Sequence, residues 1–353
     1  MLLDTCGQCF SGETGRSRLG AASWAVDKDS QERKIVRPIP RQHHYLPVGY
    51  LAGFTPSGRA RDRLWVHDVR QASRRDPEQP RVWRSLPAKV ARQRDLYTIG
   101  SETAQPDLLE HELMKRDDAD IRLVRKVCES RQCARDRFDD LLAFVALTYT
   151  RSPSMRPMMT RWVGSRTGLP FEEAIRDPES WTWLAQWLSQ PLPAIYALVE
   201  TCAQKAQLWH VLVIDVLKHS ILPLLKRRQW SLCVSQSKDY VVCSNSPLGI
   251  TWPLDHPSGK RPTLGDDRAI LTFPLDRHTA LVAGLDGPGC GRHVSRDAVA
   301  QINSQTVLSL RTHAAQQSFV FAPADRFYCM GNDGLLDVSG TDFTLVSEPT
   351  SGA

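Results

Sequence analysis

Two adjacent histidines, His43 and His44, are the residues whose type and placement best suit chemistry in this chain. They stand shortly before Pro47 and an apolar segment that runs to Phe54. Because proline favours the first position of a helix, we expect a helix to begin there and to orient the histidines. Histidine titrates near neutral pH and can serve as a general base or a metal ligand. The alternative interpretation is that a histidine at this position only caps a turn.

Two carboxylates, Glu110 and Asp117, are seven residues apart in a segment, 107–129, whose apolar residues repeat with a helical period. Seven residues amount to about 700°, so both carboxylates lie on one face of the expected helix, beside apolar residues. A carboxylate placed there needs a cation, a metal or hydrogen-bond donors. We therefore expect Glu110 to pair with an arginine, foremost Arg151, although a solvated face or a purely structural ion pair would give the same pattern. Together with His44, the two carboxylates form a candidate ligand set for a hard divalent metal ion.

Arg151 follows an apolar helical pattern over 139–150 and precedes Pro153. Positive charge at the carboxyl end of a helix complements the helix dipole, which is one explanation for it. The other is that Arg151, with Arg156, clamps an anion and stabilises developing negative charge.

Two asparagines have similarly divided interpretations. Asn245 lies in a Ser-Asn-Ser-Pro segment after an apolar strand, which is either an ordinary turn or a loop that carries a site residue. Asn303 shares a helical stripe with apolar residues, so it is either a buried structural amide or a site residue. The candidate catalytic set is then His43, His44, Glu110, Arg151, Asn245 and Asn303.

Stronger signatures are absent from the sequence, which contains no P-loop, no G-x-S-x-G and no H-E-x-x-H motif. The glycine-rich stretch 287–291 has the wrong spacing for a dinucleotide loop. Cys6 and Cys9 form a single C-x-x-C without the second pair that a zinc ribbon needs.

Composition indicates a globular protein with a modest excess of positive charge. The 353 residues carry a net charge of +6, and most of the 45 basic residues are arginine. This bias reflects either a GC-rich genome or an anionic, phosphate-bearing ligand, because guanidinium groups suit phosphate and carboxylate. The nine cysteines, an odd number in mostly apolar surroundings, favour reduced thiols in a cytoplasmic protein. The longest apolar stretch, 208–225, contains charged residues and a proline, so no membrane partner is expected.

Hydrophobic periodicity predicts strands near both ends and helices between them. Strands are expected at 64–69, 82–83, 96–99, 230–234, 240–243, 269–273, 279–282 and 319–321, and helices at 107–129, 139–150, within 165–228 and at 297–315. Because strands and helices do not alternate regularly, the fold class is α+β, with a helix-rich middle and a mixed or antiparallel sheet built from N- and C-terminal strands. Residues 1–36 are expected to be a disordered leader, 37–325 a single domain, and 326–353 a loose tail.

The same segments, in the same order, resemble domain-of-unknown-function family 4238, a family of bacterial proteins with no established activity. The likeness covers roughly residues 40–325 and rests on His44–Pro47, Tyr50-Leu51, Phe54, Leu64–Val69, Leu96-Tyr97, the helix with Glu110, Arg151–Pro153, Cys243–Leu248, Phe273–Leu275 and Asn303. The family usually shows an aspartate where this chain has Asn245, and an amide cannot act as a base. The resemblance implies the fold more firmly than it implies a function.

Two functions are compatible with these residues. The first is a hydrolase that acts on a phosphate-bearing substrate, nuclease-like or a toxin-type effector, with a divalent metal ion as its candidate cofactor. The second is a non-catalytic binding or interaction module in which the motif residues are structural. Convergence of the candidate residues on one pocket, with His44 near Asn303 or the 244–247 turn, would favour the enzyme. Scatter of these residues over the fold would favour the binding module.

Overall fold

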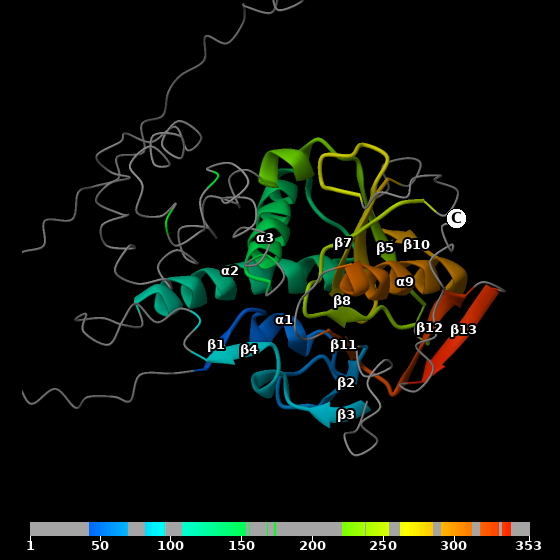
Figure 1. Cartoon of the computed structure of the whole chain (residues 1–353), viewed down its shortest axis with the longest axis horizontal. Helices are drawn as coiled ribbons and strands as arrows, with labels where there is room; N and C mark the ends of the chain where they lie inside the picture. Colours follow the sequence, from blue (N-terminus) through cyan, green and yellow to red (C-terminus); the bar gives the residue numbers. More distant parts are fainter. Residues whose placement is uncertain are drawn as a thin grey trace, which may run out of the picture. The chain divides into compact units, whose positions relative to one another are not determined.

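The computed structural model shows an α+β protein whose described part belongs to one compact unit, residues 39–353 (Figure 1). It describes residues 42–69, 82–94, 96, 108–152, 155, 168, 173, 221–236, 238–253, 262–284, 291–312, 318–331 and 334–339. The expected leader 1–36 and most of the expected helical region 165–228 lie outside these residues. Within that region, residues 221–226 are helical.

One sheet joins strands that are far apart in the sequence, as the sequence predicts. Its order is β3 (Val82–Ser85), β2 (Leu64–Asp68), β11 (Phe319–Ala322) and β6 (Cys243–Ser244), and every neighbouring pair is antiparallel. The register places Phe321 opposite Val66, so two buried apolar side chains share one face of the sheet. Strands β2 and β11, which are about 250 residues apart in the sequence, therefore stabilise each other by direct pairing.

A second sheet is buried between helices. Its order is β10 (Arg292–His293), β5 (Trp230–Val234), β9 (Thr279–Ala283), β8 (Ile270–Asp276) and β7 (Gly249–Thr251), antiparallel except for the parallel pair β10–β5. Along β9, Leu281 and Ala283 join the main core, whereas Ala280 and Val282 join a cluster with residues of the C-terminal helix. Since successive side chains alternate between faces, both faces of this strand are covered, which explains why all its residues are apolar or small.

Four labelled helices surround these sheets: α1 (Val48–Ala52), α2 (Leu108–Ser130), α3 (Phe138–Thr150) and α9 (Arg296–Thr312). The last three begin and end close to the bounds that periodicity predicts, because each has a sustained apolar stripe. Short 3-10 turns occur at η2 (Pro87–Lys89) and η3 (Arg135–Arg137). None of the described helices combines the length and the apolarity needed to cross a lipid bilayer.

The C-terminal region departs from the expectation of a loose tail after residue 325. Strands β12 (Arg326–Gly331) and β13 (Gly334–Ser339) form an antiparallel hairpin, and β12 contacts α9 (Figure 1). Phe327 and Cys329 are buried in one cluster with Leu310 of α9. The segment after residue 325 is rich in glycine and aspartate, but every second residue at the start of β12 is apolar, and these side chains pack on α9.

Tyr50 on α1 occupies the centre of the aromatic core. Its ring stacks on Phe273 at a centroid distance of 5.8 Å and meets Phe54 and Phe144 edge-on at 5.3 and 5.5 Å. Its hydroxyl donates a 2.6 Å hydrogen bond to the backbone oxygen of Pro274 on β8. Burial is the largest cause that raises the pKa of Tyr50 well above its ordinary value, so the hydroxyl stays a neutral donor. This one side chain fixes α1 against the second sheet.

Replacing Tyr50 with phenylalanine should cost about 1–3 kcal/mol of unfolding free energy, because the buried Pro274 carbonyl loses its donor while the ring is kept. Tyr50→Leu removes the ring contacts as well and should cost more. Urea unfolding followed by tryptophan fluorescence measures both. An unchanged midpoint for Tyr50→Phe would show that the hydroxyl does not anchor α1.

Candidate functional site

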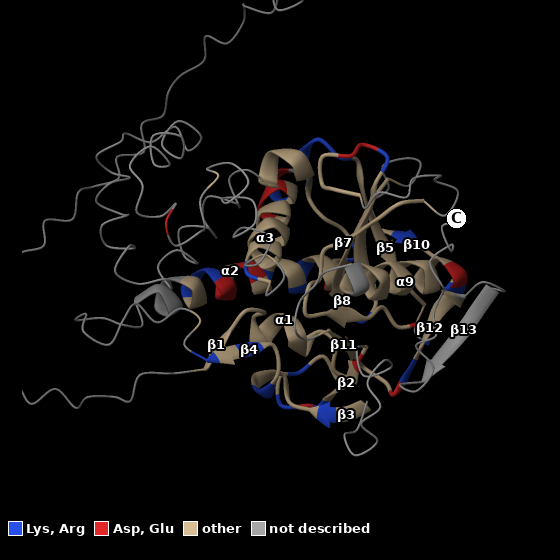
Figure 2. Cartoon of the chain, viewed as in Figure 1, with Lys and Arg blue, Asp and Glu red and all other residues tan. Residues whose placement is uncertain are grey.

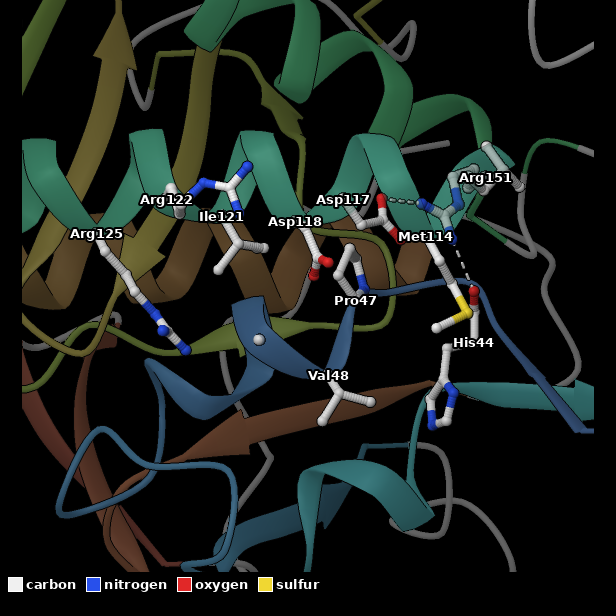
Figure 3. A pocket seen from close by; sticks show the side chains of 12 residues that line it. His44, Pro47, Val48, Met114, Asp117, Asp118, Ile121, Arg122, Arg125 and Arg151 are labelled. Atoms are coloured by element: carbon white, nitrogen blue, oxygen red, sulfur yellow. Dashed lines mark hydrogen bonds and ion pairs between the residues drawn. The ribbon is translucent and has the colours of Figure 1, made fainter. Parts of the chain in front are cut away.

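A cavity of about 410 Å³ lies where the chain after β1 meets helix α2 (Figure 3). It is lined by His44, Pro47, Val48, Gly49, Leu113, Met114, Asp117, Asp118, Ile121, Arg122, Arg125 and Arg151. The absent side chain of Gly49 lets α1 approach α2 closely, since a Cβ there would lie 2.9 Å from Cγ2 of Ile121. The cavity thus combines an apolar floor with charged residues from α2 and α3, which is the usual make-up of a small-molecule site.

Arg151 closes one end of this cavity and connects three elements. It caps the carboxyl end of α3, and its side chain is only 3% exposed. Nη1 donates to Oδ1 of Asp117 on α2 at 2.6 Å, and Nη2 donates to the backbone oxygen of His44 on β1 at 2.9 Å. A buried guanidinium requires such acceptors, because its charge has lost its water. The geometry therefore gives Arg151 a positioning role rather than the role of an open anion clamp.

Asp117 is the described partner of this arginine, and 13% of its side chain remains exposed. Burial raises the pKa of the Asp117 carboxyl, and the positive charge of Arg151 opposes that shift. The short Oδ1–Nη1 distance indicates an ion pair whose attraction offsets much of the desolvation cost. Oδ1 of Asp117 therefore serves the ion pair that connects α2 to the end of α3.

The two histidines lie on strand β1 (Gln42–His44), not at the start of a helix; the helix begins after Pro47, as predicted. The side chain of His43 is completely buried, whereas that of His44, on the other face of the strand, is partly exposed. Nε2 of His44 lies 3.1 Å from the backbone oxygen of Ala88. Because a carbonyl can only accept, Nε2 carries the proton, and Nδ1 is the nitrogen that can accept one in the neutral ring.

Three charged lining residues were missed by the sequence reasoning: Asp118, Arg122 and Arg125. They are four and three residues apart on α2, so they follow one face of the helix toward its carboxyl end, and all three are exposed. In Figure 3, Asp118 points toward Pro47 and Arg125 extends toward α1. The seven-residue spacing that linked Glu110 to Asp117 does not reach them, because they lie about 80–140° around the helix from Asp117.

Glu110 lies on α2, but its side chain is outside the described residues, so its predicted pairing with Arg151 stays a prediction. The same holds for the proposed ligand set of His44, Glu110 and Asp117. Among the side chains that the structure describes, no group of three His, Cys, Asp or Glu residues is arranged to hold a metal ion. His44 and Asp117 do line the same cavity.

The two candidate asparagines do not line this cavity, so the expected approach of His44 to Asn303 or to the 244–247 turn is not found in it. Asn303, fully buried, accepts from the Val242 amide at 3.0 Å and donates to the carbonyls of Tyr240 and Tyr328 at 2.9 Å each. Its amide therefore connects α9 to β12 and to the segment before β6, as the structural interpretation predicts.

Asn245 connects two strands of the first sheet. Its Oδ1 accepts from the Phe319 amide at 2.9 Å, and its own backbone amide donates to the Phe319 oxygen at 3.0 Å. The residue is 1% exposed. A single acceptor atom on a short side chain satisfies this geometry, so the amide works here without any acid–base chemistry.

Comparison with known proteins identifies a family but no characterised relative. The family model described as "Protein of unknown function (DUF4238)" matches residues 42–322, which is most of the chain. No curated protein and no solved structure matches it.

Replacing Arg151 with methionine should destabilise the protein by about 3 kcal/mol at neutral pH, because it leaves the Asp117 carboxylate partly buried without its cation. The double variant Arg151→Met/Asp117→Asn should recover part of that loss, since no unpaired charge remains. Asp118→Asn, an exposed neighbour, serves as the control and should change stability by less than about 0.5 kcal/mol.

The destabilisation by Arg151→Met should also depend on pH. The folded-state pKa of Asp117 is raised, so its protonation favours the folded state; that contribution is complete below the ordinary value of 3.8 and is lost as pH rises through the folded-state pKa. Without Arg151 the pKa rises further, so the difference from wild type should shrink on acidification. Urea unfolding from pH 4 to 8 measures it, and a difference independent of pH would exclude the ion pair as the cause.

Replacing Asn303 with alanine should cost on the order of 3 kcal/mol, because three buried backbone groups lose their partner. Gln301→Ala, on an exposed position of the same helix, is the matched control and should be close to neutral. Thermal and urea unfolding test the pair. Wild-type stability in Asn303→Ala would return this residue to the list of functional candidates.

Proposed function

The chain belongs to the DUF4238 family, and we propose that it is a hydrolase that binds a phosphate-bearing substrate in the cavity between β1, α1 and α2. The observation that carries this proposal is the composition of the cavity wall. Three arginines and two aspartates line the cavity together with apolar residues and with His44, whose Nε2 lies 3.1 Å from the Ala88 oxygen. An excess of guanidinium groups in a concave site favours an anionic ligand.

Arg122 and Arg125 are the residues that would bind the phosphate. Both are exposed and line the cavity, whereas the guanidinium of Arg151 already donates to Asp117 and to His44. Guanidinium forks match phosphate oxygens in pairs and stabilise the negative charge that develops when water attacks phosphorus. Arg151 would act indirectly, by holding the backbone that carries His44.

His44 would be the general base. Its Nε2 lies 3.1 Å from the Ala88 oxygen and would donate to it, so a proton from the attacking water would go to Nδ1. Asp117 and Asp118 line the same cavity and would orient that water. In the metal-dependent form of the proposal, His44, Glu110 and Asp117 would be the ligands, and a divalent ion would supply a more acidic water.

The second candidate function is a non-catalytic binding module. It is favoured by the roles of Asn245 and Asn303, whose side chains bind backbone groups away from the cavity, and by the commitment of Asp117 to Arg151. The cavity would then bind an anionic ligand without transforming it.

A substitution of His44 by glutamine separates the two functions. Glutamine can still donate to Ala88 but cannot take a proton, so hydrolysis should fall by roughly 10²–10⁴-fold while ligand affinity changes little. The assay uses bis(p-nitrophenyl) phosphate, p-nitrophenyl phosphate and nucleotides, each with EDTA, Mg²⁺ or Mn²⁺. Metal-stimulated turnover would support the metal-dependent form.

Arg122→Ala/Arg125→Ala should weaken binding of the same ligands, measured by calorimetry or thermal shift. Lys238→Ala/Arg268→Ala removes the same charge from exposed positions outside the cavity and is the matched control. Binding that depends on the two cavity arginines without any turnover would select the binding module. If no phosphate-bearing ligand binds, or if the cavity and control variants behave alike, the proposal is wrong.

A further inference from the structure

The small sheet beside the cavity adds positive charge next to His44. Strand β4 (Arg92–Arg94) pairs antiparallel with β1, with Arg92 opposite His44 and Arg94 opposite Gln42. Residues directly opposite each other on antiparallel strands project to the same face, and so do residues two apart on one strand. Arg92 and Arg94 therefore project on the face that carries His44, and both are exposed.

Helix α2 supplies the second row of positive charge. Arg122 and Arg125 are three residues apart on its cavity face, while β4 lies beyond β1 and His44. Figure 2 shows basic residues on β4 and along α2. The described part of the chain thus has exposed arginines on α2, which lines the cavity, and on β4, which pairs with the strand that carries His44; these are more than one phosphate group needs.

The cavity itself has an apolar lining that a bare anion would not use. Pro47, Val48, Leu113 and Ile121 contribute to it, and Met114 is 58% exposed at its wall. Met114 is the one large hydrophobic side chain that is strongly exposed among the described residues. Exposed apolar surface in a concave site commonly marks the place of a ligand's apolar part, and methionine adapts well to flat, polarisable groups.

We propose that the ligand of this surface is a single strand of nucleic acid, with one unstacked nucleotide in the cavity and the flanking phosphates on Arg92 and Arg94 of β4; this rests on the proposed function. Such a strand carries flat bases and phosphate groups in turn. The apolar lining of the cavity would contact a base, and the arginines beside it would bind the phosphates. A duplex keeps its bases stacked inside, so it cannot place one in the cavity. A small phosphate ester has no second phosphate that could extend from the cavity to β4.

Binding of fluorescent decanucleotides, as RNA and as DNA, tests the inference, with a mononucleotide and a duplex of the same sequence for comparison. With four arginines on phosphates, the logarithm of affinity should fall against the logarithm of salt with a slope of about −3, from roughly −0.7 for each single-strand contact. Arg92→Ala/Arg94→Ala should make the slope shallower by about 1.4 and weaken decamer binding, with mononucleotide binding unchanged.

Arg122→Ala/Arg125→Ala should weaken both ligands, and Lys238→Ala/Arg268→Ala should weaken neither. Tighter binding of either decamer than of the mononucleotide, with this dependence on β4, supports the inference. Decamers that bind no better than the mononucleotide, an equally tight duplex, or a slope unaffected by the β4 variant would overturn it and leave the proposed function intact. Arginine-dependent binding of anionic vesicles or polyglutamate without decamer binding would also overturn it. If no phosphate-bearing ligand binds at all, the proposed function fails as well.

Discussion

The buried guanidinium of Arg151 is the constraint on which the candidate site depends. Its charge is almost completely removed from water, so it must be surrounded by acceptors, and those acceptors are on different elements. Asp117 supplies a carboxylate from α2, and His44 supplies a backbone oxygen from β1. Because one planar group binds both, the end of α3, the middle of α2 and the strand with His44 keep a fixed geometry.

Three other buried polar side chains, those of Tyr50, Asn245 and Asn303, bind backbone groups inside the core. Tyr50 uses its hydroxyl on a backbone oxygen of β8 while its ring fills the aromatic cluster. Asn303 and Asn245 bind backbone groups of neighbouring strands. The family resemblance includes an aspartate at the position of Asn245, and a carboxylate oxygen could accept the same Phe319 amide. This position therefore acts on the first sheet through the Phe319 amide, and it does not line the cavity.

Arginines on the described surface and in the core have two different functions in this interpretation. Those whose side chains are buried, Arg151 and Arg228, donate to backbone oxygens and connect separate segments; Arg228 lies just before β5. Those that are exposed at the cavity wall, Arg122 and Arg125, remain accessible to solvent and, in the proposed function, to a ligand. The composition alone does not distinguish these two groups of arginines, because they differ only in how far their side chains are buried.

The sequence by itself determined the elements whose signal is local. The apolar stripes of α2, α3 and α9 and the short apolar runs of β2, β5 and β9 predict those elements close to their observed bounds, since periodicity reflects which face is buried. The pairing of N- and C-terminal strands, and hence the α+β class, followed from the order of these elements.

The tertiary structure alone decided which side chains meet. The two histidines lie on a strand, and Arg151 forms an ion pair with Asp117. Both asparagine side chains form hydrogen bonds with backbone groups. The segment expected to be a loose tail forms a β-hairpin. Each of these depends on contacts between distant segments, and the same local pattern is compatible with several such contacts. The cavity arises in the same way, because its walls come from β1, α1, α2 and α3 and no one of these segments has a concave surface alone.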